Sequence, residues 1–292
     1  APGTAVFPAM NGMRSVVSLN GHAGGTIADL ETGQMKLGFG KSSHMYFNLQ
    51  LKGLPDINNA EVSESTAANH LNQTEKSSYI LIDLVRVGRS NGEIHLVAGG
   101  DIREVDAFDA DVDVTAHHVS ISVQGEFGSS VNPELNLELD VSEFTFSGRD
   151  LVCAFAGDIV LSVSASGIID VKAIGTISVE HMVSGGGKIT LTAGENILLG
   201  YADAGAQNGV VTLTAGGSIY ELEPADDGVD LIAREAYLYA GSHIGGGSEG
   251  NLYLETEVEI LVAQVGDSTI YINELDDIEL KSVIAPDGEI GI

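Results

Sequence analysis

The chain has 292 residues, of which 43% are hydrophobic, 37 are glycine and none is tryptophan. Its 42 acidic and 13 basic residues give a formal net charge of −29, which would repel nucleic-acid phosphates and an anionic membrane surface. This charge argues against a nucleic-acid-binding protein. No apolar run is long enough for a helix of this chain to cross a membrane.

The first 79 residues have strand-like patterns without a regular repeat. Alternating apolar residues predict strands in VVSLNGHAGGTIADL, from residue 16, and in MYFNLQLKG, from residue 45. Residues 56–78 are polar and have no apolar period, which predicts a loop or short helical insertion. We therefore expect an irregular N-terminal β region over residues 1–79, with this insertion protruding from it.

Residues 80–292 contain one repeat inside another. NGEIHLVAGGDIREV (91–105) and NGVVTLTAGGSIYEL (208–222) are nearly identical at an offset of 117 positions (209 minus 92), and the similarity extends over 80–137 against 197–254. A shorter unit also recurs, with successive starts at 187, 209, 228, 250 and 268. Self-similarity at a roughly constant period is typical of stacked repeats.

The short unit predicts two strands joined by a tight corner. Each unit has a glycine, an alternating apolar run, a small residue or glycine, and a second alternating run, as in GKITLTAGENILL at 187. Antiparallel hairpins would also have two strands per unit, but the same side chains recur at the same place in each unit and would align as ladders in stacked coils. The sequence therefore predicts an all-β parallel β-solenoid over residues 80–292. Cys153, the single cysteine, lies in its apolar run LVCAFAG and is expected to be a buried thiol.

Three stretches of the repeat region resemble a known family. GKITLTAGENILL, GVVTLTAGGSI and GDIVLSVSASGIIDVKA are similar to the β-helical repeats of large secreted bacterial adhesins of the filamentous-haemagglutinin kind. The resemblance extends over about 80–292 and is clearest at 157–222. It implies a right-handed parallel β-helix, secretion, and a place on a microbial surface.

Acidic residues gather at three places in the repeat region, and the first two places are equivalent in the long repeat. The clusters are Asp106, Asp109, Asp111 and Asp113 in VDAFDADVDV; Glu221, Glu223, Asp226 and Asp227 in ELEPADD; and Glu274, Asp276 and Asp277 in NELDD. Calcium prefers several oxygen ligands from flexible loops. We therefore predict calcium ligands among Asp106, Asp109, Asp111, Glu223, Asp226 and Asp227. The alternative is a solvated acidic edge, since the G-G-x-G-x-D nonapeptide of calcium-bound β-rolls is absent.

Catalytic patterns are weak in this chain. A unique active site would occur once, whereas the acidic clusters recur, and the Asp-Asp, Gly-His-Gly and Arg-x-Lys set of polygalacturonase-like enzymes is absent. His117-His118 aligns with Arg234-Glu235 across the long repeat, which indicates exposed corner residues rather than metal ligands. We expect a protein that is not an enzyme; the alternative is a carbohydrate-active β-helix enzyme, a polysaccharide lyase or hydrolase.

The last residues, PDGEIGI, end within a strand pattern without an amphipathic cap. A coil without a neighbour exposes backbone groups that pair with another chain. We therefore expect a segment of a longer protein, a subunit that docks end to end into a filament, or a tail that folds back as a cap. The predicted function is an extracellular structural or adhesive solenoid of a cell surface, with self-association through the solenoid ends and a glycan or cell-surface receptor as a further partner.

Overall fold

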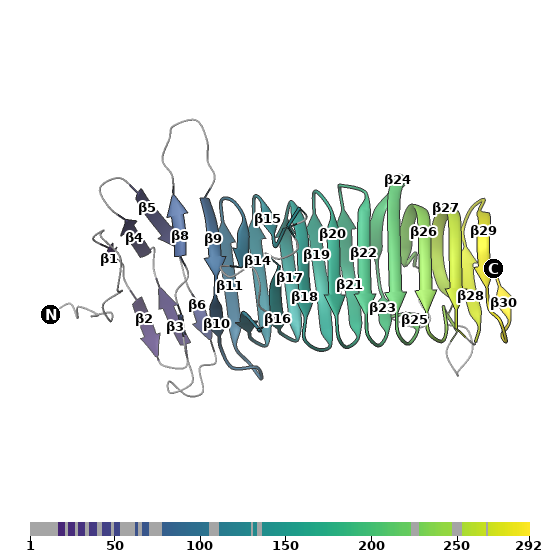
Figure 1. Ribbon diagram of the computed structural model, residues 1–292, viewed down its shortest axis with the longest axis horizontal. Helices are drawn as coiled ribbons and strands as arrows, with labels where there is room; N and C mark the ends of the chain where they lie inside the picture. The colour runs from purple at the N-terminus through teal and green to yellow at the C-terminus, as the bar shows by residue number, and fades with distance from the viewer. Residues whose placement is uncertain are drawn as a thin grey trace.

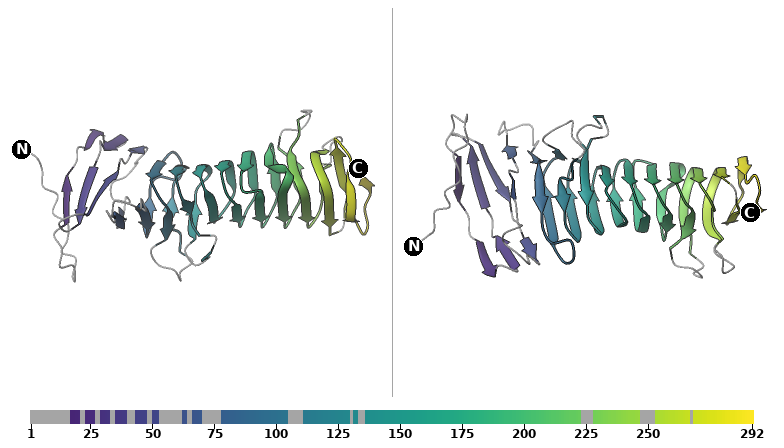
Figure 2. Two further views of the ribbon diagram at one scale, coloured as in Figure 1. Left: turned by 90° about the horizontal axis from the view of Figure 1, so that it is seen from above. Right: turned by 60° about the horizontal axis from the view of Figure 1, so that its bottom comes forward.

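The computed structural model is a rod of stacked β-coils, with its first strands at one end and the C-terminus at the other (Figure 1). It describes residues 78–292 except 105–110, 130, 133–135, 223–227, 247–252 and 267, and eight strand segments among the first 77 residues. The predicted all-β parallel β-solenoid is confirmed, with about nine turns over residues 80–291. Two turned views show that the stack of coils continues without interruption to the C-terminal end (Figure 2). No described segment is a helix with the length and apolar character required to cross a membrane.

Each coil contributes strands to two faces of the rod, here called face A and face B. Face A contains β9 (Ser78–Ile82), β10 (Leu84–Arg86), β12 (Ile102–Glu104), β13 (Val114–Thr115), β15 (Glu126–Phe127), β16 (Leu137–Asp140), β18 (Asp150–Phe155), β20 (Ile169–Ala173), β22 (Lys188–Ala193) and β29 (Glu279–Ile284). Face B contains β11 (Glu93–Ala98), β14 (His118–Val123), β17 (Glu143–Gly148), β19 (Ile159–Ala165), β21 (Ile177–Ser184), β23 (Ile197–Leu199), β25 (Ile219–Glu221), β28 (Ile270–Glu274) and β30 (Ile290–Gly291). Three long strands run from face B into face A: β24 (Ala202–Ala215), β26 (Leu231–Ala240) and β27 (Leu254–Val265).

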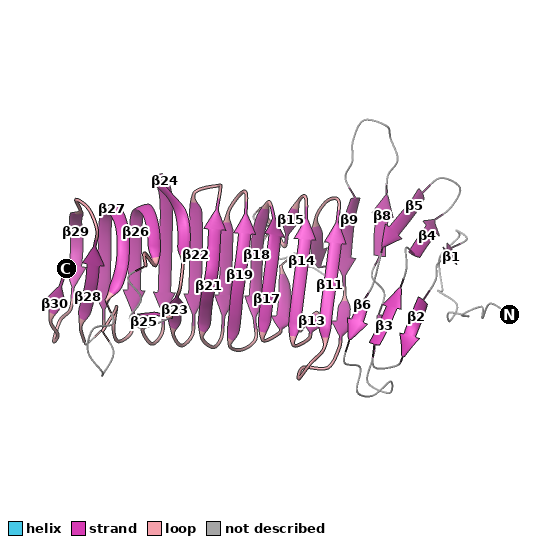
Figure 3. Ribbon diagram, turned by 180° about the vertical axis from the view of Figure 1, so that it is seen from behind, coloured by secondary structure: helices cyan, strands magenta, loops and turns pink. Residues whose placement is uncertain are grey.

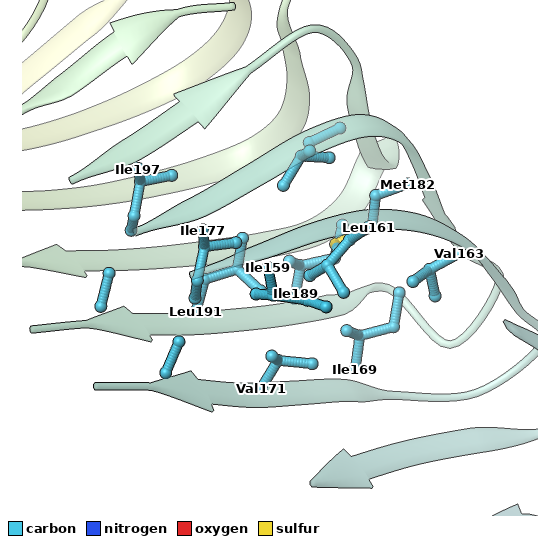
Figure 4. Packing of buried hydrophobic residues seen from close by; sticks show 14 of the residues in the cluster. Ile159, Leu161, Val163, Ile169, Val171, Ile177, Met182, Ile189, Leu191 and Ile197 are labelled. Carbon is cyan, nitrogen blue, oxygen red and sulfur yellow. The ribbon is translucent and has the colours of Figure 1, made fainter. Parts of the chain in front are cut away.

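The period-2 alternation of the sequence produces ladders of like residues inside the rod. In β22, Ile189, Leu191 and Ala193 point inward and are at most 4% exposed. Ile189 pairs with Ile169 in the coil before, and each inward residue stacks on an inward residue of the next coil. Figure 4 shows this packing of isoleucine, leucine and valine between the two faces. Four buried phenylalanines fill the earlier coils: Phe127, Phe144, Phe146 and Phe155.

Glycines form a ladder at the corner that ends face A in the later coils. They are Gly194, Gly216, Gly241 and Gly266. A Cβ atom added to Gly216 would collide with the carbonyl oxygen of Gly194, and one on Gly241 would collide with that of Gly216. This corner therefore requires glycine because the backbones of successive coils approach closely there.

The chain's own N-terminal strands pair with the start of the solenoid. β6 (Gln50–Lys52), β7 (Val62–Ser63) and β8 (Thr66–Asn69) pair antiparallel with β11, β10 and β9. β2 (Ala23–Thr26) and β3 (Asp29–Thr32) extend this pairing from β6, and β1 (Val17–Asn20), β4 (Met35–Phe39) and β5 (Ser43–Phe47) form a separate antiparallel sheet. β7 and β8 fall within residues 56–78, where we expected a loop or short helix; the remainder of that insertion, apart from the start of β9, lies outside the described residues.

The long repeat exchanges the two faces. Ile102 lies on face A, whereas Ile219, its counterpart at the offset of 117, lies on face B. From Ile102, five pairing steps along face A lead to Val211, by way of Phe127, Leu151, Ile169 and Ile189. Ile219 follows on the other face, half a coil beyond Val211. The repeat is therefore about five and a half turns long, and equivalent residues of its two copies lie on opposite faces of the rod.

Candidate metal centres

Two groups of three carboxylates occupy equivalent places in the long repeat. The first triad is Glu104, Asp113 and Glu138, and the second triad is Glu221, Asp230 and Glu255. Each member of the second lies 117 residues after its counterpart (221 minus 104, 230 minus 113, 255 minus 138). In each triad the carboxylate oxygens lie within 4.8 Å of one another. Two buried acidic triads that could hold a metal ion are therefore present among the described residues.

The same local structure builds both triads. In β12, Glu104 follows Ile102 at the alternate position, so both point inward, and Glu104 is only 3% exposed. On the same face, Asp113 directly precedes β13. Glu138 comes from β16, in the next coil. In the second triad, β25 ends at Glu221, Asp230 directly precedes β26, and Glu255 lies on β27.

A two-bond contact between neighbouring coils holds each aspartate. The backbone N–H of Glu138 donates to Oδ2 of Asp113 at 2.8 Å, and the N–H of Asp113 donates to the carbonyl oxygen of Glu138 at 2.9 Å. Glu255 and Asp230 repeat both bonds, each at 2.9 Å. The side-chain bond occupies one oxygen of each aspartate and orients its carboxylate toward the other two acids.

The second triad concentrates negative charge in a buried place. The pKa of Asp230 is raised from its ordinary value of 3.8 to about 8, chiefly because the group is buried. The backbone N–H of Glu255 acts against this rise, whereas the hydrogen bond to the Glu255 side chain and the charges of Glu221 and Glu255 add to it. Oε2 of Glu255 is buried and accepts no hydrogen bond from any described residue. Three carboxylates cannot all be ionised here without compensation, so this site holds either a proton or a cation near neutral pH.

The surroundings of the two triads have diverged. Asp101 and Arg103 lie just before Glu104 in the chain, and Glu126 lies between Asp113 and Glu138. Ser218, Tyr220 and His243 stand at the equivalent positions of the second copy. Arg103 lies 2.9 Å from Asp101, and Arg149 binds Glu126. In the second copy, the imidazole of His243 instead makes 2.7 Å hydrogen bonds with Ser242 and Ser268. Ion pairs in one copy are thus replaced by hydrogen bonds between histidine and serine in the other, while the triads themselves are identical.

The structure describes one of the six predicted calcium ligands. Asp111 is exposed and belongs to neither triad, and Asp106, Asp109, Glu223, Asp226 and Asp227 lie outside the described residues. Two other members of the same acidic clusters, Asp113 and Glu221, do belong to the triads. The predicted calcium ligands did not include Glu104, Glu138, Asp230 or Glu255. Identity across the 117-residue offset was the signal that could have found them, since all three acids of the first triad are retained in the second.

The remaining candidate residues have structural contacts. His117 lies 3.6 Å from Glu143, and His118 lies 3.3 Å from the hydroxyl of Thr145, at the corner where exposed residues were predicted. In the NELDD cluster, Glu274 accepts hydrogen bonds from the hydroxyl of Thr256 and the N–H of Val258. Burial raises the pKa of Glu274. Asp276 and Asp277 are exposed, so this cluster does not form a third triad.

Comparisons with protein-family models, with curated proteins and with solved structures found no match. Of what the adhesin resemblance implied, the structure supports the architecture, a β-solenoid of about nine turns. No family or relative identifies the chain as an adhesin.

Proposed function

We propose that the protein is a structural and adhesive rod of an extracellular microbial surface, in which the two acidic triads bind calcium. The observation that carries this proposal is the retention of both triads, with the same contacts, in two copies whose neighbouring residues have changed. A core of stacked aliphatic ladders supports the structural role, because such a core gives a long, regular and stiff body.

Calcium fits the chemistry of the triads better than a transition metal does. All six side chains offer carboxylate oxygens and none offers nitrogen or sulfur, which is the ligand set of hard cations. Calcium–oxygen distances of about 2.3–2.6 Å allow oxygens within about 5 Å of one another to share one ion. The cation would neutralise the buried charge and join two neighbouring coils.

The burial of the triads also supports a structural role over hydrolysis. A glycoside hydrolase needs a pair of carboxyl groups that reach the scissile bond. Glu104, Asp113, Glu221 and Asp230 are all at most 5% exposed, so a polysaccharide on the surface would not reach them. A carbohydrate-active enzyme therefore remains the alternative with less support from the geometry.

Self-association would use the C-terminal coil. Leu280 and Ile290 are 50% and 49% exposed there, although they pair with the buried Leu261 and Ile270 of the coil before, so a further coil, from a continuing chain or from another copy, would cover them. The opposite end of the solenoid pairs with β6, β7 and β8 of its own chain. End-to-end assembly would therefore join this apolar coil to the N-terminal strands of a neighbour rather than to a bare first coil.

Calcium titration calorimetry of chelator-treated protein tests the cation role. We expect two sites per chain for the native protein, one for Asp113→Asn or Asp230→Asn, and none for the double variant. Asp170→Asn on β20 makes the same charge change away from the triads and should retain both sites.

Negative-stain microscopy with millimolar calcium and with chelator tests assembly, and filaments of uniform width would support it. Absence of calcium binding in the native protein would overturn the cation role, and isolated rods in both conditions would overturn end-to-end assembly.

A further inference from the structure

The outer surface of face B carries a regular grid of hydroxyl groups. In β14, β17 and β19, two alternate outward positions of each strand hold serine or threonine: Ser120 and Ser122, Thr145 and Ser147, Ser162 and Ser164. The pairing registers place these residues in two columns, Ser120–Thr145–Ser162 and Ser122–Ser147–Ser164. The strands lie side by side in the view from behind (Figure 3). Hydroxyls are therefore spaced by about 4.8 Å between coils and about 6.6 Å along each strand.

Ring side chains mark both ends of the first column. His95 precedes Ser120 and His181 follows Ser162 in the same pairing series. The ring of His95 meets His118 edge to face at 6.2 Å, and the exposed ring of His181 stacks on Tyr201 at 5.1 Å. The second column begins at Val97, which is 75% exposed, and ends at Val183. The columns thus form one strip across five coils, about 19 Å long at the usual strand spacing.

The strip is free of carboxylates and ammonium groups on a strongly acidic molecule. None of its ten positions carries Asp, Glu, Lys or Arg, although the chain has a net charge of −29. Glu93, Glu143 and Glu180 lie at its margins. Glu93 lies 3.5 Å from Nε2 of His95, and Glu180 accepts a hydrogen bond from the hydroxyl of Ser162 at 3.1 Å. An anionic partner would be repelled by the rod as a whole, and a polycation would be attracted to the acidic surfaces instead. The strip therefore fits a neutral partner that bears many hydroxyls.

From this arrangement we infer that the strip binds a neutral polysaccharide with an extended β-linked backbone, lying along the axis of the rod. This inference rests on the adhesive role proposed above and names its partner. An extended β-linked sugar advances by nearly the spacing of one coil, so successive sugars meet successive rungs. Serine and threonine hydroxyls both donate and accept hydrogen bonds, as sugar hydroxyls do. The rings at the two ends present flat π faces on which the C–H faces of sugars can pack.

Affinity electrophoresis in gels containing hydroxyethyl cellulose tests the inference. Dextran, an α-linked neutral glucan, serves as the linkage control, and alginate as the anionic control. We expect hydroxyethyl cellulose to retard the native protein, and dextran and alginate to leave its mobility unchanged. The double variant Ser122→Asp, Ser147→Asp places two charges on the strip and should bind at least about tenfold more weakly. Thr192→Asp, Thr214→Asp makes the same charge change on face A and should bind as the native protein does.

Each other outcome overturns the inference. It is wrong if no neutral β-glucan retards the native protein, or if both double variants bind equally. It is also wrong if the strip variants change the sedimentation of the protein alone, because the strip would then be a contact between copies. His181→Ala, which removes one end ring without adding charge, provides a second variant should the first one fold poorly. Calcium stoichiometry measured on the same preparations separates the two proposals, since a native protein that has two calcium sites but binds no neutral β-glucan contradicts only this one.

Discussion

Asp113 and Asp230, on opposite faces of the rod, make the same pair of hydrogen bonds to a glutamate 25 residues further along the chain. A duplication that shifted the chain by whole turns would have placed them on one face. The shift by about five and a half turns instead places one triad on each face. If both triads bind calcium, the ions reinforce the rod from two sides.

The first prediction concerns the pH dependence of stability in the absence of calcium. The folded-state pKa of Asp230, about 8, lies above its ordinary value of 3.8, so between these values the folded state binds more protons than the unfolded state. The contribution of Asp230 to the free energy of unfolding is therefore fully present below pH 4 and is lost as the pH rises through 8. In chelator, we expect the Tm of the native protein to fall between pH 5 and pH 9.

Asp230→Asn should remove much of that decrease. The asparagine Oδ1 can still accept the N–H of Glu255, and no proton is lost on raising the pH. We expect the variant to have a higher Tm than the native protein at pH 9 and a similar Tm at pH 5. Parallel Tm curves for the two proteins, measured by scanning calorimetry beside Asp170→Asn, would contradict the assignment.

The second prediction concerns the glycine ladder. Gly216→Ala should lower the free energy of unfolding by more than about 1 kcal/mol, because the new methyl group would collide with the carbonyl oxygen of Gly194. Gly157→Ala is the matched control, since its Cβ would have no atom within 4 Å. It should be neutral or stabilise the fold by about 0.4–1 kcal/mol, through the reduced entropy of the unfolded chain. Urea unfolding followed by circular dichroism separates the two; equal effects would show that the ladder does not constrain the corner.

The third prediction concerns the aromatic part of the core. Phe144 lies 5.7 Å from Phe127 and 5.4 Å from Phe155, between ring centroids, and is 1% exposed. Phe144→Ala should lower the free energy of unfolding by about 3–5 kcal/mol, because it leaves a cavity that neighbouring coils cannot close. Ile174→Ala changes a side chain that is 73% exposed and should stay within about 0.5 kcal/mol of the native protein. A cost below about 1 kcal/mol for Phe144→Ala would indicate that this part of the stack repacks freely.

The fourth prediction concerns Cys153. Its thiol is buried, and burial raises its pKa well above the ordinary value, so little thiolate forms at pH 8. A disulfide reagent should react with the native protein only as fast as the solenoid opens, and at once in denaturant. Rapid labelling without loss of structure would mean that this region of the core opens locally.

For residues 80–292, the sequence alone was sufficient to predict a stack of β-strands and the identity of the inward ladders. Strict alternation in runs such as KITLTA specifies which residues face the core, and recurrence of the same run specifies that they stack, because both follow from local spacing. Cys153 was placed correctly for the same reason. The recurrence of acidic residues at equivalent places of the long repeat was visible too.

Only the tertiary structure decided which faces and which acids belong together. The coils of the rod differ in length, with pairing steps of 25 residues from Ile102 to Phe127 and 18 from Leu151 to Ile169, so an offset of 117 could not be converted into turns from the sequence. The predicted ligands came from the densest acidic runs, whereas each triad takes two acids that flank such a run and a third, Glu138 or Glu255, from the next coil. A contact between coils depends on how the chain closes each turn, which no single segment encodes.

The hydroxyl strip has the same origin: its serines and threonine are ordinary outward residues in every strand, and only the register of three coils brings them into one grid.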